Sequence, residues 1–234
     1  METRAEILAR LRAQLCRGVG PSAAENLQEE EVVSTGLPQL DAWLPEGGLR
    51  RGWLVDWLTS PGVGGAVVAL WVAHRCAVAA DFPTVVVIDP QGSFHPPAAA
   101  AWGVSLEALL WVRPSSEQDA WWAWEEALRS GVFPVVWGWV PRLPLRWYRR
   151  LQLACEAGRG LGMLVRPESS LRQPCWAAVR WRVEPIPSRP EDSLGTRRWR
   201  VTALRVPGAW PGESEAPEVE IVLRACTLEW EEAS

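Results

Sequence analysis

The chain has 234 residues, a formal net charge of −4 and 24 basic residues, all of which are arginine. This length is sufficient for one sizeable domain with a core of its own, and the mild acidity gives no general attraction for nucleic acid. The 5 cysteines form no CxxC pair and there are only 2 histidines, which argues against a disulfide framework and against a metal site.

The first predicted element is a short amphipathic helix over residues 2–15, in which Ile7, Leu8, Leu11 and Leu15 recur at helical spacing. An acidic run at residues 29–31 follows and predicts a solvated linker. The start of the chain lacks the pattern of a signal peptide, and no apolar segment has transmembrane length. We therefore expect a cytoplasmic protein without membrane contact, with residues 1–33 forming a helix and a linker.

Strands and helices are predicted to alternate after this linker. The pattern predicts strands at 53–58, 84–89, 109–112, 132–140 and 161–165, and helices at 66–80, 97–102, 117–130 and 145–157. Such alternation predicts an α/β fold with a mainly parallel, twisted sheet flanked by helices. Residues 176–184, 198–205 and 218–223 predict further strands in an antiparallel extension. We assign residues 34–206 to the core and residues 207–234 to a C-terminal strand and an acidic tail.

A glycine-rich segment, Ser60–Val67, lies between the first core strand and the following helix. Such a segment can present backbone N–H groups to phosphate, here those of Gly62, Gly64 and Gly65. A phosphate-binding loop also needs a Lys and a Ser or Thr where the helix begins, whereas this chain has Ala66 and Val67. The alternative interpretation is a tight turn in which the glycines adopt positive φ, and we favour this turn.

Two further features of the core bear on its surface and its turns. Trp121, Trp122 and Trp124 cannot all face the core from one helix, so we expect at least one of them at the surface. Asp89 is the last residue of a predicted strand, a possible polar site residue, although a single acidic residue there is more often a turn former.

Several segments, in this order along the chain, resemble the core of RecA proteins. They are Val33–Asp41 (VSTGLPQLD), Glu46–Gly52 (EGGLRRG), the glycine-rich segment and Val87–Gln91 (VIDPQ). A second set resembles the ImuA family, the RecA-like accessory proteins of bacterial mutagenic translesion synthesis. It consists of Leu110–Pro114 (LWVRP), Trp139–Leu143 (WVPRL), Arg149–Ala154 (RRLQLA) and Arg166–Pro167 (RP).

This resemblance implies a RecA-like core whose catalytic positions are replaced. Ala66 and Val67 stand where the family has its lysine and threonine, and Gln91 stands where it has the glutamate that orients the attacking water. The magnesium-binding acid is replaced by Trp137, which is followed by Gly138. Phosphoryl transfer depends on charge stabilisation and positioning, so the three losses together predict a pseudo-ATPase without cofactor or metal.

The resemblance also implies partners. These are an ImuB-like Y-family protein, an error-prone DNA polymerase and RecA. The helix that contains Ile7, Leu8, Leu11 and Leu15 matches a RecA helix that docks on the neighbouring protomer, which implies self-association as an alternative to packing on the same chain. The resemblance and the replaced catalytic positions together predict a non-catalytic adaptor in SOS-induced mutagenic translesion DNA synthesis and DNA repair. Two alternative functions stay open, a divergent ATP-binding RecA-type ATPase and a SulA-like regulator of cell division.

Direct contact with DNA is expected to be weak or indirect. The segments that correspond to the DNA-binding loops of RecA are short here, residues 141–144 and 168–174. The chain does contain a candidate basic helix face for phosphate or partner contacts, formed by Arg142, Arg146, Arg149 and Arg150. An equal alternative is a solvated face whose arginines are paired with acidic residues.

Overall fold

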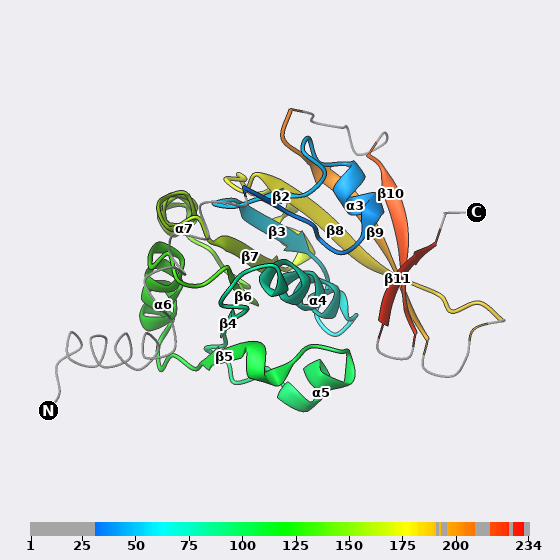
Figure 1. The fold of residues 1–234 in the computed structure, drawn as a ribbon, viewed down its shortest axis with the longest axis horizontal. Helices are drawn as coiled ribbons and strands as arrows, with labels where there is room; N and C mark the ends of the chain where they lie inside the picture. The colour runs from blue at the N-terminus through cyan, green and yellow to red at the C-terminus, as the bar shows by residue number, and fades with distance from the viewer. Residues whose placement is uncertain (1–30, 191, 193–195, 209–215, 225–226, 232–234) are drawn as a thin grey trace, which may run out of the picture.

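The computed structural model describes residues 31–190, 192, 196–208, 216–224 and 227–231. The predicted helix over residues 2–15, with Ile7, Leu8, Leu11 and Leu15, lies outside these residues. Within them, the main feature is a nine-stranded sheet in the order β11-β10-β9-β8-β3-β7-β6-β4-β5 (Figure 1). A separate two-stranded antiparallel sheet pairs β1 (Val32–Val33) with β2 (Leu49–Arg50).

The large sheet combines a parallel part with an antiparallel part. The parallel strands are β3 (Leu54–Leu58), β4 (Val85–Ile88), β5 (Leu109–Val112), β6 (Val135–Trp139) and β7 (Leu161–Arg166). The remaining strands are β8 (Val179–Ile186), β9 (Arg197–Arg205), β10 (Glu218–Arg224) and β11 (Thr227–Glu231). Strand β8 pairs in parallel with β3 and antiparallel with β9, so the antiparallel part begins at the β8–β9 pair.

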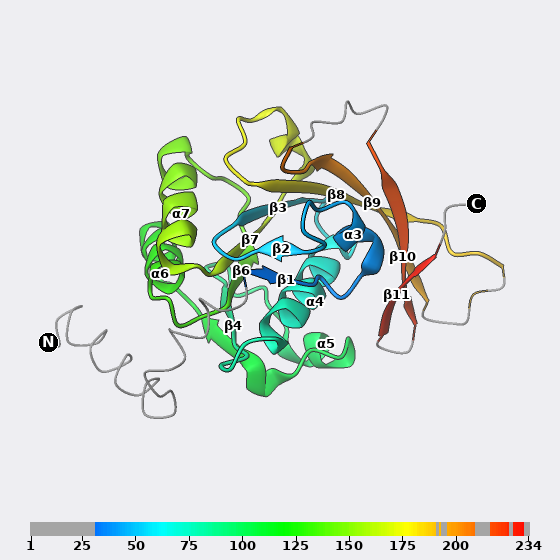
Figure 2. The same ribbon diagram turned by 45° about the horizontal axis from the view of Figure 1, so that its top comes forward.

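Helices cover both faces of the parallel part (Figures 1 and 2). One side has α4 (Gly65–Val78) and α5 (Pro96–Ala101), and the other side has α6 (Glu117–Arg129) and α7 (Leu145–Gly158). Buried apolar side chains form one cluster on each side of the sheet. Each described helix is too short or too polar to cross a lipid bilayer.

The segment that leads into the core is held by one carboxylate. The Asp41 side chain, in the short helix α3 (Pro38–Ala42), accepts hydrogen bonds from the Thr35 backbone N–H at 2.9 Å and from the Ser34 hydroxyl at 2.6 Å. Between them the chain turns at Gly36 with φ of 80°. The Ser-Thr-Gly…Leu-Asp pattern therefore has a local structural role, because it closes the turn before β2 and β3.

The predicted α/β fold is confirmed. The bounds of each predicted strand and helix of the core differ from the observed bounds by at most three residues, and the antiparallel C-terminal strands are present. The sequence did not predict β1, β2 and β11. Trp137 is the third residue of β6, inside the strand predicted at 132–140.

Candidate functional site

The glycine-rich segment forms a turn from the end of β3 into α4. Gly62 and Gly64 have φ of 80° and 87°, in the region that residues with side chains rarely adopt. Gly64 directly precedes the first helical residue, Gly65. A β-carbon on Gly65 would lie 2.2 Å from Oγ1 of Thr59, so only glycine fits beside that side chain.

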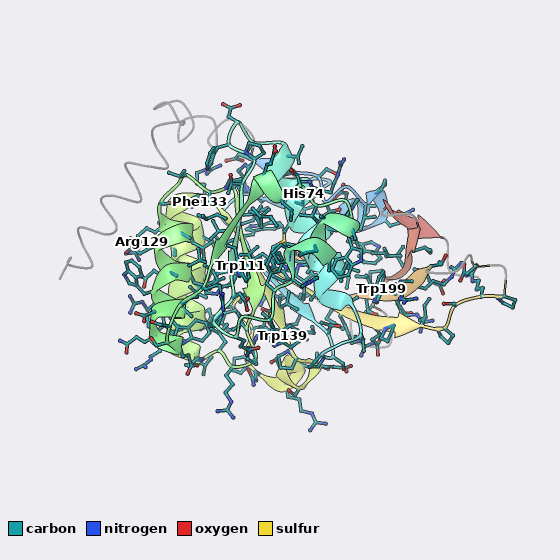
Figure 3. All side chains as sticks on the ribbon, turned by 90° about the horizontal axis from the view of Figure 1, so that it is seen from below. His74, Trp111, Arg129, Phe133, Trp139 and Trp199 are labelled. Carbon is teal, nitrogen blue, oxygen red and sulfur yellow. The ribbon has the colours of Figure 1, made fainter. Side chains whose placement is uncertain are left out.

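A tryptophan from the antiparallel part of the sheet covers this turn. The indole Nε1–H of Trp199 donates a hydrogen bond to the carbonyl oxygen of Val63 at 2.7 Å. A β-carbon on Gly64 would lie 2.7 Å from Cζ2 of the same ring. Figure 3 shows Trp199 on β9, beside the N-terminal end of α4. The turn is therefore packed against the protein on its Trp199 side.

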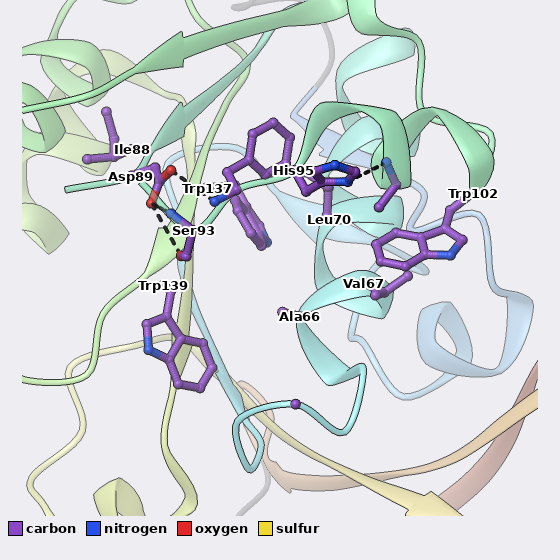
Figure 4. Close-up of a pocket in the computed structure, with 13 residues that line it drawn as sticks. Ala66, Val67, Leu70, Ile88, Asp89, Ser93, His95, Trp102, Trp137 and Trp139 are labelled. Atoms are coloured by element: carbon purple, nitrogen blue, oxygen red, sulfur yellow. Dashed lines mark hydrogen bonds between the residues drawn. The ribbon is translucent and has the colours of Figure 1, made fainter. Parts of the chain in front are cut away.

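A cavity of about 310 Å³ lies on another side of the turn, beyond the carboxyl ends of β4 and β6 (Figure 4). Ligands of open α/β sheets commonly bind at these strand ends. Aromatic and aliphatic side chains form most of its wall. The lining residues are Gly62, Ala66, Val67, Leu70, Ile88, Asp89, Ser93, Phe94, His95, Ala98, Trp102, Trp137 and Trp139.

Two polar side chains of this cavity, Asp89 and His95, are already engaged within the protein. The Asp89 carboxylate accepts hydrogen bonds from the backbone N–H groups of Ser93 at 3.0 Å and Phe94 at 2.9 Å, and from the indole of Trp111 at 3.2 Å. His95 accepts at Nδ1 from the backbone of Ala98 at 3.2 Å and so caps α5. Asp89 is thus a turn former in this structure.

The chemistry of the cavity wall does not fit Mg-nucleotide. The lining residues include no arginine, and their one carboxylate is the engaged Asp89. Among the described residues, no group of three His, Cys, Asp or Glu side chains could hold a metal ion. A phosphate group here would lack a cationic partner, and burying a charge without one is costly.

The structure brings together only part of the predicted site. Gly62, Ala66, Val67 and Trp137 share the cavity wall. Gly64 and Gly65 do not line it. Gln91 lines a neighbouring cavity of about 380 Å³ that also includes Arg142, and Trp139 lines both cavities.

Sequence reasoning missed the aromatic character of this wall. Trp137 and Trp139 are two residues apart on β6, a spacing that places both side chains on one face of a strand. The two-residue period of a strand could have identified Trp139 as a residue on the same face as Trp137. Phe94 packs edge-on to Trp111 with ring centroids 5.7 Å apart and lies 6.2 Å from Trp137, contacts that no short-range pattern indicates.

The predicted basic face is exposed but is not uniform. Arg142 lies in the loop before α7, whereas Arg146, Arg149 and Arg150 lie on the helix, and all four are exposed. Arg150 forms an ion pair with Glu125 of α6, whereas Arg149 lies 5.0 Å from the ring centroid of Trp176. The alternative of arginines paired with acidic residues therefore holds for Arg150, and contact of this face with phosphate or a partner stays a prediction.

The three tryptophans of α6 are divided between core and periphery. Trp121 and Trp124 are buried, whereas Trp122 is half-buried. This division agrees with the expectation that one helix cannot turn all three rings inward.

A mainly parallel sheet with helices on both faces, and a glycine turn between its first core strand and α4, define a RecA-like α/β protein. Protein ImuA of Caulobacter vibrioides is 30% identical to this chain over 200 residues, which cover 77% of this chain and 81% of the relative. The chain belongs to the ImuA family.

Shorter similarities extend to two other kinds of protein. The cell division inhibitor SulA of Edwardsiella piscicida is 39% identical over 69 residues, 30% of this chain and 41% of the relative. Protein RecA of Azospirillum lipoferum is 32% identical over 114 residues, 49% of this chain and 31% of the relative. No protein-family model matches the chain. The family connects the chain with mutagenesis induced by DNA damage.

Proposed function

We propose that this protein is a non-catalytic adaptor in SOS-induced mutagenic translesion DNA synthesis. The main support is the wall beside the glycine turn, where Ala66, Val67 and Trp137 replace the residues that a RecA core uses for nucleotide. Catalysis of phosphoryl transfer needs a cationic clamp, a metal and a group that positions the nucleophile. An apolar cavity supplies none of these, so the retained fold serves other contacts.

The partners that we propose are an ImuB-like Y-family protein, an error-prone DNA polymerase and RecA, all in the cytoplasm. Family membership supports this choice. The RecA similarity, which covers about half of this chain, supports contact with RecA-type surfaces through the core at residues 34–206. The segment with Ile7, Leu8, Leu11 and Leu15 is proposed to mediate self-association.

Reconstitution with purified partners tests this function. The chain is mixed with the ImuB-like protein, the error-prone polymerase or RecA from the same organism, and complexes are measured by light scattering after size exclusion. We expect a stoichiometric complex with at least one partner, formed equally well with and without ATP–Mg²⁺. Failure of all three partners to bind, singly or together, would contradict the adaptor function.

A further inference from the structure

We propose that one exposed surface of α7 binds an acidic segment of a partner protein that also bears aliphatic or aromatic side chains. This inference rests on the adaptor function proposed above. The surface, called the α7 surface below, consists of Arg142, Leu145, Arg146, Arg149, Leu153 and Trp176.

Large apolar side chains are exposed at this surface. Leu145, Leu153 and Trp176 are 52%, 42% and 42% exposed. Leu145, Arg149 and Leu153 follow one another at intervals of four residues, which aligns them along one side of the helix. Scattered apolar residues at a surface need no explanation, but a group of them on one face indicates an interaction site.

The arginines of the α7 surface lack acidic partners within the described part of the chain. Arg142 and Arg146 form no ion pair there. Arg149 donates to the neutral side chain of Gln152 and lies over the ring of Trp176. Three guanidinium groups are therefore available for carboxylates, which they bind with favourable geometry.

The helix that presents these side chains is firmly anchored. On its opposite side Tyr148 and Leu151 are buried, and the Tyr148 hydroxyl donates to the Asp56 carboxylate at 2.7 Å. The ion pair of Arg150 with Glu125 also connects α7 to α6. A surface that is ordered before binding loses less conformational entropy when the partner docks.

The same side chains favour a protein over a nucleic acid. The side chains of Leu145 and Leu153 cannot bind phosphate groups. The Arg149 guanidinium lies 5.0 Å from the Trp176 ring centroid and so occupies the face of the ring on which a base would stack. The N-terminal residues 1–17 of this chain contain four arginines and two glutamates, so charge repulsion disfavours them as the occupant. An acidic partner segment complements both the charge and the apolar character.

The test uses the ImuB-like protein of the same organism, labelled with fluorescein, and measures its affinity by anisotropy. Two variants change the α7 surface, R146E/R149E for its charge and L145S/L153S for its apolar side chains. Arg197 is also exposed but lies on β9, so R197E is the matched control. Because all five positions are exposed, the variants should fold, which circular dichroism checks. A labelled oligothymidylate of about 20 nucleotides provides the nucleic-acid comparison.

We expect each α7 variant to weaken binding at least about tenfold and R197E to leave it within about twofold. Added salt should weaken wild-type binding and have less effect on R146E/R149E. If R146E/R149E and L145S/L153S both bind the partner as tightly as the wild type does, the α7 surface is not the binding site, whereas the adaptor function is unaffected. If the α7 variants lose binding to oligothymidylate but still bind the partner protein, the proposed acidic protein segment is wrong and the α7 surface binds nucleic acid. Absence of wild-type binding to all three proposed partners would instead overturn the adaptor function.

Discussion

Replacing Asp56 by asparagine lowers the free energy of unfolding by about 3–5 kcal/mol, because it leaves buried arginines without their counter-charge. Asp56 of β3 and Arg166 of β7 are both 0% exposed, and their closest charged atoms are 3.3 Å apart. The same carboxylate oxygen accepts from Arg180 at 2.8 Å and from the Tyr148 hydroxyl at 2.7 Å. This one carboxylate therefore joins β3, β7, β8 and α7.

Few other groups could compensate for the lost carboxylate. Arg166 also donates to the Gln173 side chain at 2.5 Å, and Arg180 to the Leu171 carbonyl at 3.3 Å. Burial, together with the nearby Asp56 and Cys175, raises the pKa of Tyr148 well above its usual value. The phenol therefore stays protonated and acts as a donor, which cannot neutralise a guanidinium.

Urea unfolding followed by circular dichroism measures the effect of D56N. The control is Y148F, which keeps both ion pairs and removes the contacts of the hydroxyl with Asp56, the Ala177 backbone N–H and the Cys175 sulfur, at a cost of about 1–3 kcal/mol. An unfolding free energy of D56N within about 1 kcal/mol of the wild type would show that this network does not hold the sheet together.

Replacing Trp199 by alanine lowers the free energy of unfolding by about 3–5 kcal/mol, the usual range for a buried aromatic ring. Trp199 is 3% exposed and packs on Gly64, and its indole N–H binds the Val63 carbonyl. The substitution therefore removes core volume and also frees the glycine turn. Hydrogen exchange of the backbone amides at residues 62–65 should become faster by a larger factor than exchange in α7, which is distant from this contact.

W199F separates the packing from the hydrogen bond. Phenylalanine retains most of the ring volume but cannot donate to Val63, so a cost of about 1 kcal/mol is expected for the lost bond. The same denaturation and exchange measurements apply to both variants. If W199A and W199F had equal effects, the packing of the ring would contribute nothing beyond its hydrogen bond. Unchanged exchange at the turn in W199A would show that Trp199 does not hold the turn.

Local sequence patterns were sufficient for most of the fold. The continuous β-branched run at β4 and the serine that caps α6 are short-range signals, and both elements lie where they were expected. The two-residue strand β1 and its partner β2 are too short to produce a period. Strand β11 depends on pairing with β10, which a local pattern does not specify.

The candidate site was less predictable, because its form depends on contacts between distant parts of the chain. Ala66 and Val67 are recognisable from their place after the glycines. In contrast, Trp199 reaches Val63 across 136 positions of sequence. Gln91 lies outside the cavity because of the path of the chain after β4. There the Asp89 carboxylate accepts hydrogen bonds from the backbone N–H groups of Ser93 and Phe94, and Gln91 lines the neighbouring cavity.

The central claim, a RecA-like protein without nucleotide chemistry, is tested most directly by titration with ATP–Mg²⁺ in a calorimeter, with phosphate release measured on the same sample. Ala66 lines the cavity at the start of α4, so A66W should obstruct the place where nucleotide would bind. We predict no saturable binding up to millimolar ATP and no phosphate release above the buffer rate, for the wild type and for A66W alike. Saturable binding with turnover in the wild type, abolished by A66W, would contradict the account.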